Sequence, residues 1–95
     1  MLDTIFAKQD NFITRNIAGE ILVVPISGQI GDLDCVYNLD EVSSFVWNKL
    51  DGATKVSDLA QAVHREYTVT LEESTADVIE LLADLEKEGL VSAVG

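Results

Sequence analysis

Cys35 and His64 are the side chains best suited to nucleophilic or metal chemistry, and each is the only one of its type in the sequence. A Cys/His nucleophile needs both groups to meet in space beside a third, orienting group, and the sequence around neither residue predicts such a meeting. A zinc site of the usual kind needs more Cys and His ligands. The pattern therefore favours Cys35 as a small hydrophobic strand residue and indicates neither a metal nor a cofactor.

Carboxylates are abundant, and acid/base chemistry would use a pair of them. The adjacent pairs Asp40-Glu41 and Glu72-Glu73 stand at predicted helix starts, where negative charge stabilises the helix dipole. The segment "SGQIG" is not followed by the Lys-Ser/Thr pair of a phosphate-binding loop. These patterns predict that the chain is not an enzyme.

The overall charge limits the partners of the protein. The 95 residues include 17 acidic and 6 basic ones, for a formal net charge of −11. Such a surface repels nucleic-acid phosphates and anionic lipid head groups. No apolar run approaches the roughly 20 residues that span a bilayer, and the first residues lack the basic start of a signal peptide. We expect a soluble, cytoplasmic protein without nucleic-acid or membrane partners.

Three strands are predicted before the first helix. The segment "NFITRNI" alternates with period two, "EILVVPI" is β-branched and apolar on both faces, and "LDCVYNL" follows the loop "SGQIGD". Their short connections predict an antiparallel meander. Residues 1–11 are predicted to form an N-terminal arm that can hold a short strand, and residues 12–95 a single domain.

The first predicted helix begins near residues 38–40 and ends at Gly52. Asn38 or Asp40 caps it, and Asn38 has a glutamate three positions later, as in a capping box. Its apolar residues recur at the spacing of one helix face. Trp47 lies off the centre of that face, and we expect it in the core rather than in a binding site.

Two further helices and a tail follow. The second helix is predicted over about residues 55–67, with Thr54 or Ser57 as its cap. The third is predicted over about residues 71–88, and "T-x-x-E" from Thr70 is a capping box. The final "LVSAV" either returns as a short strand or packs as a tail.

The apolar stripe of the third helix is flanked by two different strips of residues, which we call its shoulders. Ile79 and Ala83 widen the stripe on one side, with Thr75 and Glu86 on the flanks. This shoulder either packs against the sheet or forms the wall of a groove. The stripe consists of Val78, Leu81, Leu82 and Leu85, and the other, acidic shoulder of Asp77, Glu80 and Asp84.

The order of the elements predicts an α+β fold, with a three-stranded antiparallel N-terminal sheet followed by a winged-helix-like three-helix bundle. A winged helix would suggest DNA binding. However, the third helix, which would enter the DNA groove, carries seven acidic residues against Lys87 alone. A DNA-binding helix needs the opposite charge.

Residues 12 to 92 resemble the PqqD-like family, the precursor-peptide recognition domains of pathways that make ribosomally synthesised, post-translationally modified peptides. The family pattern contains a Leu-Asn step, a Trp, "L-D-G", "T-V-x-[DE]-L" and "V-x-x-[FL]-L-x-x-L-x-x-x-G-L". Asp40 stands after Leu39 where the family has Asn, or else the register is off by one residue. The matching residues are Asn38-Leu39, Trp47, Leu50-Asp51-Gly52, Thr54, Val56, Asp58-Leu59, Val78, Leu81-Leu82, Leu85 and Gly89-Leu90.

The resemblance implies a non-enzymatic carrier of a precursor peptide. Family members hold the leader of that peptide as an added strand against the third strand, beside the third helix, and present it to a modifying enzyme, often a radical-SAM protein. The third strand ends a meander, so one of its edges is available for such pairing. The implied peptide-binding residues are Leu33, Asp34, Cys35, Val36, Tyr37, Thr75, Ile79, Leu82, Ala83 and Glu86.

Acidic residues near that cleft favour a leader with some basic residues and predict that binding weakens with salt. An alternative function is self-association, in which the same strand edge pairs with a second copy to give a homodimer.

Overall fold

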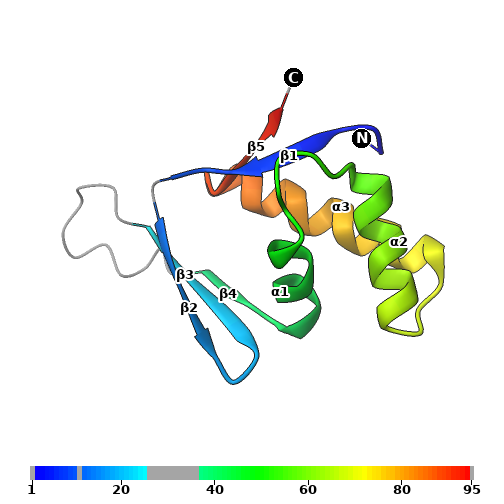
Figure 1. Cartoon of the computed structure of the whole chain (residues 1–95), viewed down its shortest axis with the longest axis horizontal. Helices are drawn as coiled ribbons and strands as arrows, with labels where there is room; N and C mark the ends of the chain where they lie inside the picture. The colour runs from blue at the N-terminus through cyan, green and yellow to red at the C-terminus, as the bar shows by residue number, and fades with distance from the viewer. Residues whose placement is uncertain (1, 11, 26–36, 95) are drawn as a thin grey trace.

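The computed structural model describes residues 2–10, 12–25 and 37–94 (Figure 1). The α+β class is confirmed, but the strands form two separate antiparallel sheets instead of one. Residues 33–36 of the predicted third strand lie outside the described residues. The elements are β1 (Ile5–Lys8), β2 (Phe12–Ile17), β3 (Glu20–Pro25), β4 (Tyr37–Leu39), α1 (Glu41–Asn48), α2 (Val56–Glu66), α3 (Leu71–Lys87) and β5 (Val91–Val94).

The larger sheet has the order β2-β3-β4. Strands β2 and β3 form a hairpin in which Ile17 pairs with Glu20. Its two central residues, Ala18 and Gly19, have φ angles of 53° and 86°. Positive φ at both positions is the signature of a type I′ turn, which matches the twist of paired strands. The hairpin projects from the rest of the molecule (Figure 1).

The smaller sheet joins the two ends of the described chain. Strand β1 pairs with β5, with Ile5 opposite Val94 and Lys8 opposite Val91. Phe6 is buried in the core. The segment predicted as an arm therefore contributes a strand and a core residue, and of the two alternatives for the tail the strand is the one observed.

Helix α1 is capped by Asp40, whose Oδ1 accepts a hydrogen bond from the Ser43 N–H at 2.8 Å. The capping box predicted at Asn38 is therefore wrong, because Asn38 still belongs to β4. Asn and Asp accept this bond equally well at an N-cap. Asp40, the other candidate named from the sequence, is the cap that the structure shows.

The first helix ends four residues before Gly52, which the sequence suggested as its stop. Gly52 instead has a φ of 76° in the turn that follows. Asp51 Oδ1 organises this turn by accepting bonds from the Ala53 N–H, the Thr54 N–H and the Thr54 hydroxyl. These bonds lower the pKa of Asp51, because they favour its charged form.

Helix α2 has no side-chain cap, so the prediction of Thr54 or Ser57 is wrong. The N–H groups of Val56 and Ser57 instead donate to the carbonyls of Thr4 and Leu2, at 2.9 and 3.0 Å. The free N–H groups at the start of α2 are thus hydrogen-bonded by a backbone segment far away in the sequence, and the residues around the helix start cannot reveal this. For α3 the cap is confirmed, since Thr70 Oγ1 accepts from the Glu73 N–H at 3.1 Å.

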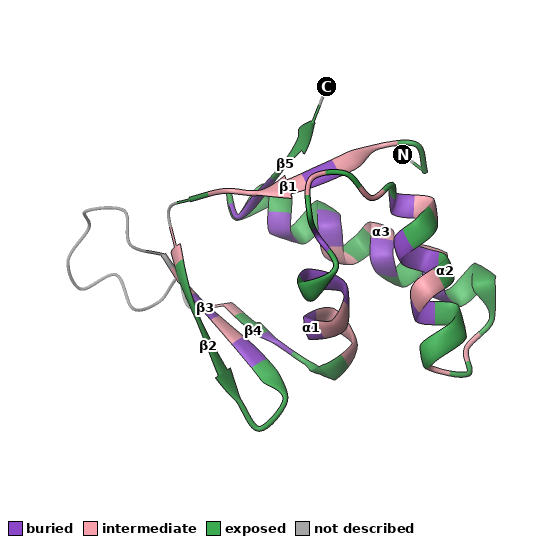
Figure 2. Cartoon of the chain, in the orientation of Figure 1, coloured by how far each residue is buried: buried purple, intermediate pink, exposed green. Residues whose placement is uncertain are grey.

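The core lies between the helices and one face of each sheet (Figure 2). Trp47 is only 2 % exposed, which confirms it as a core residue. Its ring meets Phe12 of β2 edge to face, with centroids 5.2 Å apart, and Lys8 Nζ lies 4.9 Å from its centroid. Trp47 therefore ties β1 and β2 to α1. Within the described ranges, no helix is long and apolar enough to cross a bilayer.

Candidate functional site

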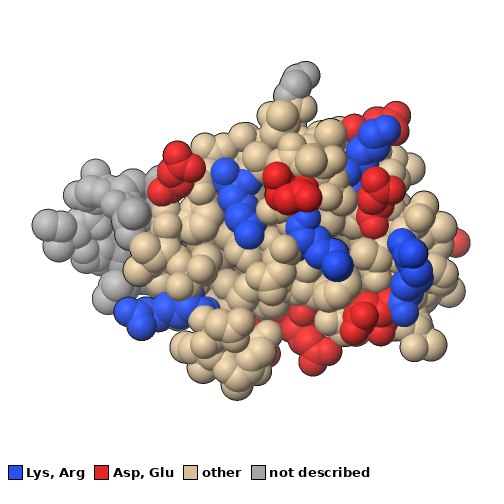
Figure 3. All heavy atoms as spheres, viewed as in Figure 1, with Lys and Arg blue, Asp and Glu red and all other residues tan. Residues whose placement is uncertain are grey.

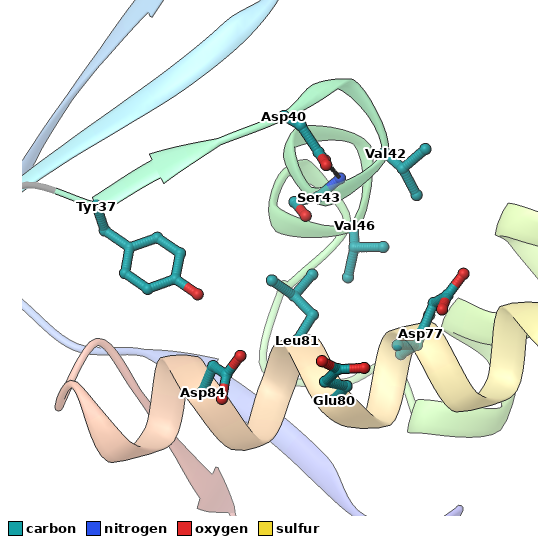
Figure 4. Close-up of a pocket in the computed structure, with 10 residues that line it drawn as sticks. Tyr37, Asp40, Val42, Ser43, Val46, Asp77, Glu80, Leu81 and Asp84 are labelled. Carbon is teal, nitrogen blue, oxygen red and sulfur yellow. Dashed lines mark hydrogen bonds between the residues drawn. The ribbon is translucent and has the colours of Figure 1, made fainter.

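A groove of about 390 Å³ runs between β4 and α1 on one side and α3 on the other (Figure 4). Side chains from all three elements point into this space, and we call it the β4 groove. Its volume is within the range of ligand pockets. The lining residues are Tyr37, Asp40, Val42, Ser43, Val46, Asp77, Val78, Glu80, Leu81 and Asp84.

The outer edge of β4 borders this groove. Among the described residues, β4 pairs only with β3 and no strand pairs with its other side. We call this side, over residues Tyr37–Leu39, the β4 edge. Unpaired strand edges carry N–H and C=O groups that are ready to accept another strand.

Ser44 shows which backbone groups point outwards. Its buried hydroxyl accepts from the Ile21 N–H and donates to the Leu39 carbonyl, both at 3.0 Å. The polar groups of Ile21 and Leu39 therefore face each other across β3 and β4. Because these directions alternate along an antiparallel strand, the N–H and C=O of Asn38 point away from β3, along the β4 edge.

The side chains of β4 alternate too. Leu39 is buried in the core, Asn38 is exposed and Tyr37 is half-buried in the lining of the groove. Tyr37 and Leu39 thus share the face that looks towards α3. A strand added at the β4 edge would continue this pattern, so every second side chain would enter the groove.

The charge of the groove is negative. Its carboxylates are Asp40 on one side and Asp77, Glu80 and Asp84 on α3, and none of the six Lys and Arg residues lines it. On the face of the molecule that Figure 3 shows, Lys and Arg side chains are interspersed with Asp and Glu side chains. Burial raises the pKa of Tyr37, and the charges of Asp84, Glu88 and Asp40 raise it further.

The other sites in the described residues offer less chemistry. No group of three or more His, Cys, Asp or Glu side chains there is arranged to hold a metal ion. A second hollow of about 420 Å³ lies against the α1–α2 turn and α2, between Asn48 and Ala62, and no strand residue lines it. Of these two hollows in the described part of the chain, the β4 groove is the one that borders a strand edge.

The predicted site residues on the third strand meet different outcomes. Tyr37 lines the groove as expected. The remaining strand residues lie outside the described residues, so their proposed contacts stay predictions. They are Leu33, Asp34, Cys35 and Val36.

The predicted site residues on the third helix do not line the groove. Leu82 is fully buried and Ile79 packs against the core, so both side chains hold α3 to the rest of the fold. Thr75, Ala83 and Glu86 are also absent from the lining. The apolar shoulder was expected either to pack against the sheet or to form the wall of a groove. Ile79 of this shoulder packs against the core, and the groove lies along the acidic shoulder instead.

Sequence reasoning missed the part played by Asp77, Glu80, Leu81 and Asp84. It treated Leu81 as one of the stripe residues, yet Leu81 is only half-buried and points into the groove (Figure 4). The available signal was its setting, since acids stand four residues before it, one before it and three after it.

Comparison with known proteins supports the resemblance. The family model for coenzyme PQQ synthesis protein D (PqqD) matches residues 30–91. Among curated proteins, none matches the chain.

Two solved structures share its fold. TbiB1, solved in complex with the TbiA(beta) leader peptide, is 21% identical with a TM-score of 0.77, over 94% of this chain and 98% of that one. Lasso peptide synthetase B1, complexed with the leader peptide, is 17% identical with a TM-score of 0.75, over 92% and 96%. The family match spans most of the sequence, including β4 and all three helices, and the chain therefore belongs to the PqqD family.

Proposed function

We propose that the protein binds the leader segment of a precursor peptide by β-augmentation at the β4 edge. The observation that carries this proposal is that the β4 edge, unpaired among the described residues, borders the β4 groove. Backbone pairing supplies affinity in this mode, and pockets for alternate side chains supply selectivity. The protein has both parts side by side.

The structural relatives support the choice of ligand. TbiB1 and lasso peptide synthetase B1 were each solved with a leader peptide, and this chain shares their fold over more than nine tenths of its length. Their low sequence identity means that the bound sequence itself need not be the same. A leader peptide is the ligand class that we carry over to this protein.

Binding would proceed through few, well-defined contacts. The N–H and C=O of Asn38 would pair with one residue of the leader, and each such bond contributes about 0.5–1.5 kcal/mol. The leader residues on either side would place their side chains in the groove, against Tyr37 and Leu81. The short length of β4 makes these side-chain contacts essential for a useful affinity.

We also propose that the protein is a carrier and not the catalyst. A separate modifying enzyme, of the radical-SAM kind or similar, would act on the peptide while the leader is held. In this arrangement the domain contributes binding energy and position, and the enzyme contributes the chemistry.

NMR titration tests the proposal. Synthetic leader peptides from short reading frames beside the gene are added to labelled protein. We expect amide shifts centred on Tyr37–Leu39 and on residues 77–84 of α3. Shifts centred on β2, or on Ile79, Ala83 and Glu86 without β4, would contradict it.

The same titration separates peptide binding from self-association through the β4 edge. Self-association predicts that the β4 amides shift with protein concentration, without peptide, and that sedimentation reports a dimer at high concentration. We expect a monomer, because two copies would bring their acidic grooves together.

A further inference from the structure

We infer that the β4 groove selects leaders with a pair of cationic side chains, Lys or Arg, at alternate positions i and i+2. This inference rests on the proposed leader binding and specifies which leaders the site accepts. It follows from the register of the β4 edge, the spacing of the acids on α3 and the apolar floor between them.

The register decides which leader residues face α3. The leader residue paired with Asn38 must direct its side chain to the same side as Asn38, away from the groove, because neighbouring strands keep their pleats in step. The residues before and after it then point to the side of Tyr37 and Leu39. These two groove-facing residues are i and i+2 of the leader.

The spacing of the α3 carboxylates matches this pair. Alternate side chains of a strand lie about 6.6 Å apart. Glu80 and Asp84, four residues apart on a helix, are separated by a rise of about 6 Å. Figure 4 shows Asp84 across the groove from Tyr37 and Glu80 across from Val46 of α1, with Leu81 between the two acids. Each cation can therefore meet its own carboxylate.

The floor of the groove suits the stems of Lys and Arg. Val42, Val46 and Leu81 give it an apolar surface, and the acids stand around that surface. Long basic side chains bury their aliphatic part on such a surface and keep the charge at its margin. Acidic leader residues would be repelled by Asp40 and by the α3 carboxylates, and no Lys or Arg of the protein lines the groove to offset this.

A displayed library of random 12-residue peptides tests the inference. It is selected against three proteins: the wild type, the double variant E80Q/D84N, and the control D3N/E66Q, which makes the same change in charge at exposed residues outside the groove. We expect Lys or Arg to be enriched at i and i+2 in the wild-type and control selections, and not in the E80Q/D84N selection. Circular dichroism confirms that each variant is folded.

Binding measurements with a single selected peptide then show how much affinity the two cations contribute. Replacing its two cations by Gln should weaken binding to the wild type roughly tenfold, in keeping with two exposed ion pairs. The same replacement should change binding to E80Q/D84N by less than about twofold. An equal loss on both proteins would show that the cations do not act through these carboxylates, and would overturn the inference.

The outcomes separate the inference from the proposed function. Selected peptides that shift the amides of Tyr37–Leu39 without alternate cations would overturn the inference and leave leader binding intact. Selected peptides that do not shift these amides at all would overturn both.

Discussion

Both outer strands of the larger sheet lack a partner on one side among the described residues, yet the two edges differ in every other respect. Strand β2 is six residues long, nearly all of them exposed, and it stands on a projecting hairpin (Figures 1 and 2). Strand β4 is three residues long and lies beside the groove against α3. The longer edge offers more backbone, but the shorter one offers places for side chains.

This difference shows what converts a strand edge into a peptide site. Along β2, Ile13 and Ile17 are 45% and 60% exposed on the outer face of the hairpin. Arg15 stands between them on that face and places a charge there, which discourages pairing with other chains. At β4, the groove-facing positions of an added strand meet apolar residues and acids that can discriminate among ligands. Backbone pairing alone would accept any sequence.

Substitution of Ser44 by alanine is the change with the largest expected effect on this comparison. It leaves the buried N–H of Ile21 and C=O of Leu39 without their shared partner, which should lower the unfolding free energy by about 2–3 kcal/mol. Because the hydroxyl anchors β4 to β3, leader binding should weaken as well. Urea unfolding followed by Trp47 fluorescence measures the first effect and NMR titration the second.

Ser43→Ala is the matched control, since Ser43 contributes its backbone N–H to the helix cap. An S44A protein as stable as the S43A protein would show that the hydroxyl does not hold β4 in place.

Proline substitutions compare the two edges directly. Asn38→Pro removes an N–H that points along the β4 edge, and Thr14→Pro removes the equivalent outward N–H of β2. We expect N38P to weaken leader binding by about 1–2 kcal/mol, or roughly tenfold, and T14P to leave it unchanged. Isothermal titration with the same leader peptide measures both.

Asn38→Ala controls for the loss of the side chain and should bind like the wild type. Equal weakening by N38P and T14P would mean that the β4 edge has no special part in binding.

A substitution at the hairpin turn should change stability without changing binding. Ala18 adopts a φ of 53°, a left-handed conformation that costs an alanine about 1 kcal/mol. Ala18→Gly removes this cost but loosens the unfolded chain, and the net gain should be about 0.5 kcal/mol. The urea midpoint should rise while the leader affinity stays the same. A change in affinity would indicate that the β2–β3 turn contributes to the site.

The smallest expected effect concerns pH. The pKa of Tyr37 is raised in the folded protein by burial and nearby acids, so the folded state retains the phenol proton longer than the unfolded state. The part of the unfolding free energy that depends on the Tyr37 proton is fully present below about pH 10, the usual pKa of tyrosine, and is lost as the pH rises above it. In urea unfolding, Tyr37→Phe should therefore lose less stability than the wild type as the pH rises above about 10.

The pKa of Tyr67 is raised as well, so Tyr67→Phe reports how much of the alkaline loss arises away from the groove. If Y37F and the wild type lose stability in parallel, burial and the nearby acids do not raise the pKa of Tyr37.

Several local features were predictable from the sequence because their causes lie within a few residues. The Thr70 cap of α3, the positions of the three helices and the family motifs all follow from short-range spacing. The start of α2 was not predictable, because its N–H groups bond to Leu2 and Thr4, more than fifty residues away. The pairing of β1 with β5 has the same long-range character.

In the candidate site, too, some features were predictable from local sequence and others depended on contacts between distant segments. The family resemblance placed Tyr37 among the peptide-binding residues, and the periodicity of α3 separated an apolar shoulder from an acidic one. Periodicity cannot say which shoulder meets β4, because that depends on how α3 is rotated against α1 and the sheet. The structure places the acidic shoulder on the groove and packs Ile79 against the core.

The sequence by itself determined the class of the fold, the family, the acidic charge and the existence of a strand followed by a capped helix at residues 37–41. Only the tertiary structure decided that the outward backbone groups of Asn38 stand beside a groove lined by Asp77, Glu80, Leu81 and Asp84. The physical reason is that charge and periodicity belong to single segments, whereas a groove exists only where two segments, here nearly forty residues apart, are packed at a fixed rotation and distance.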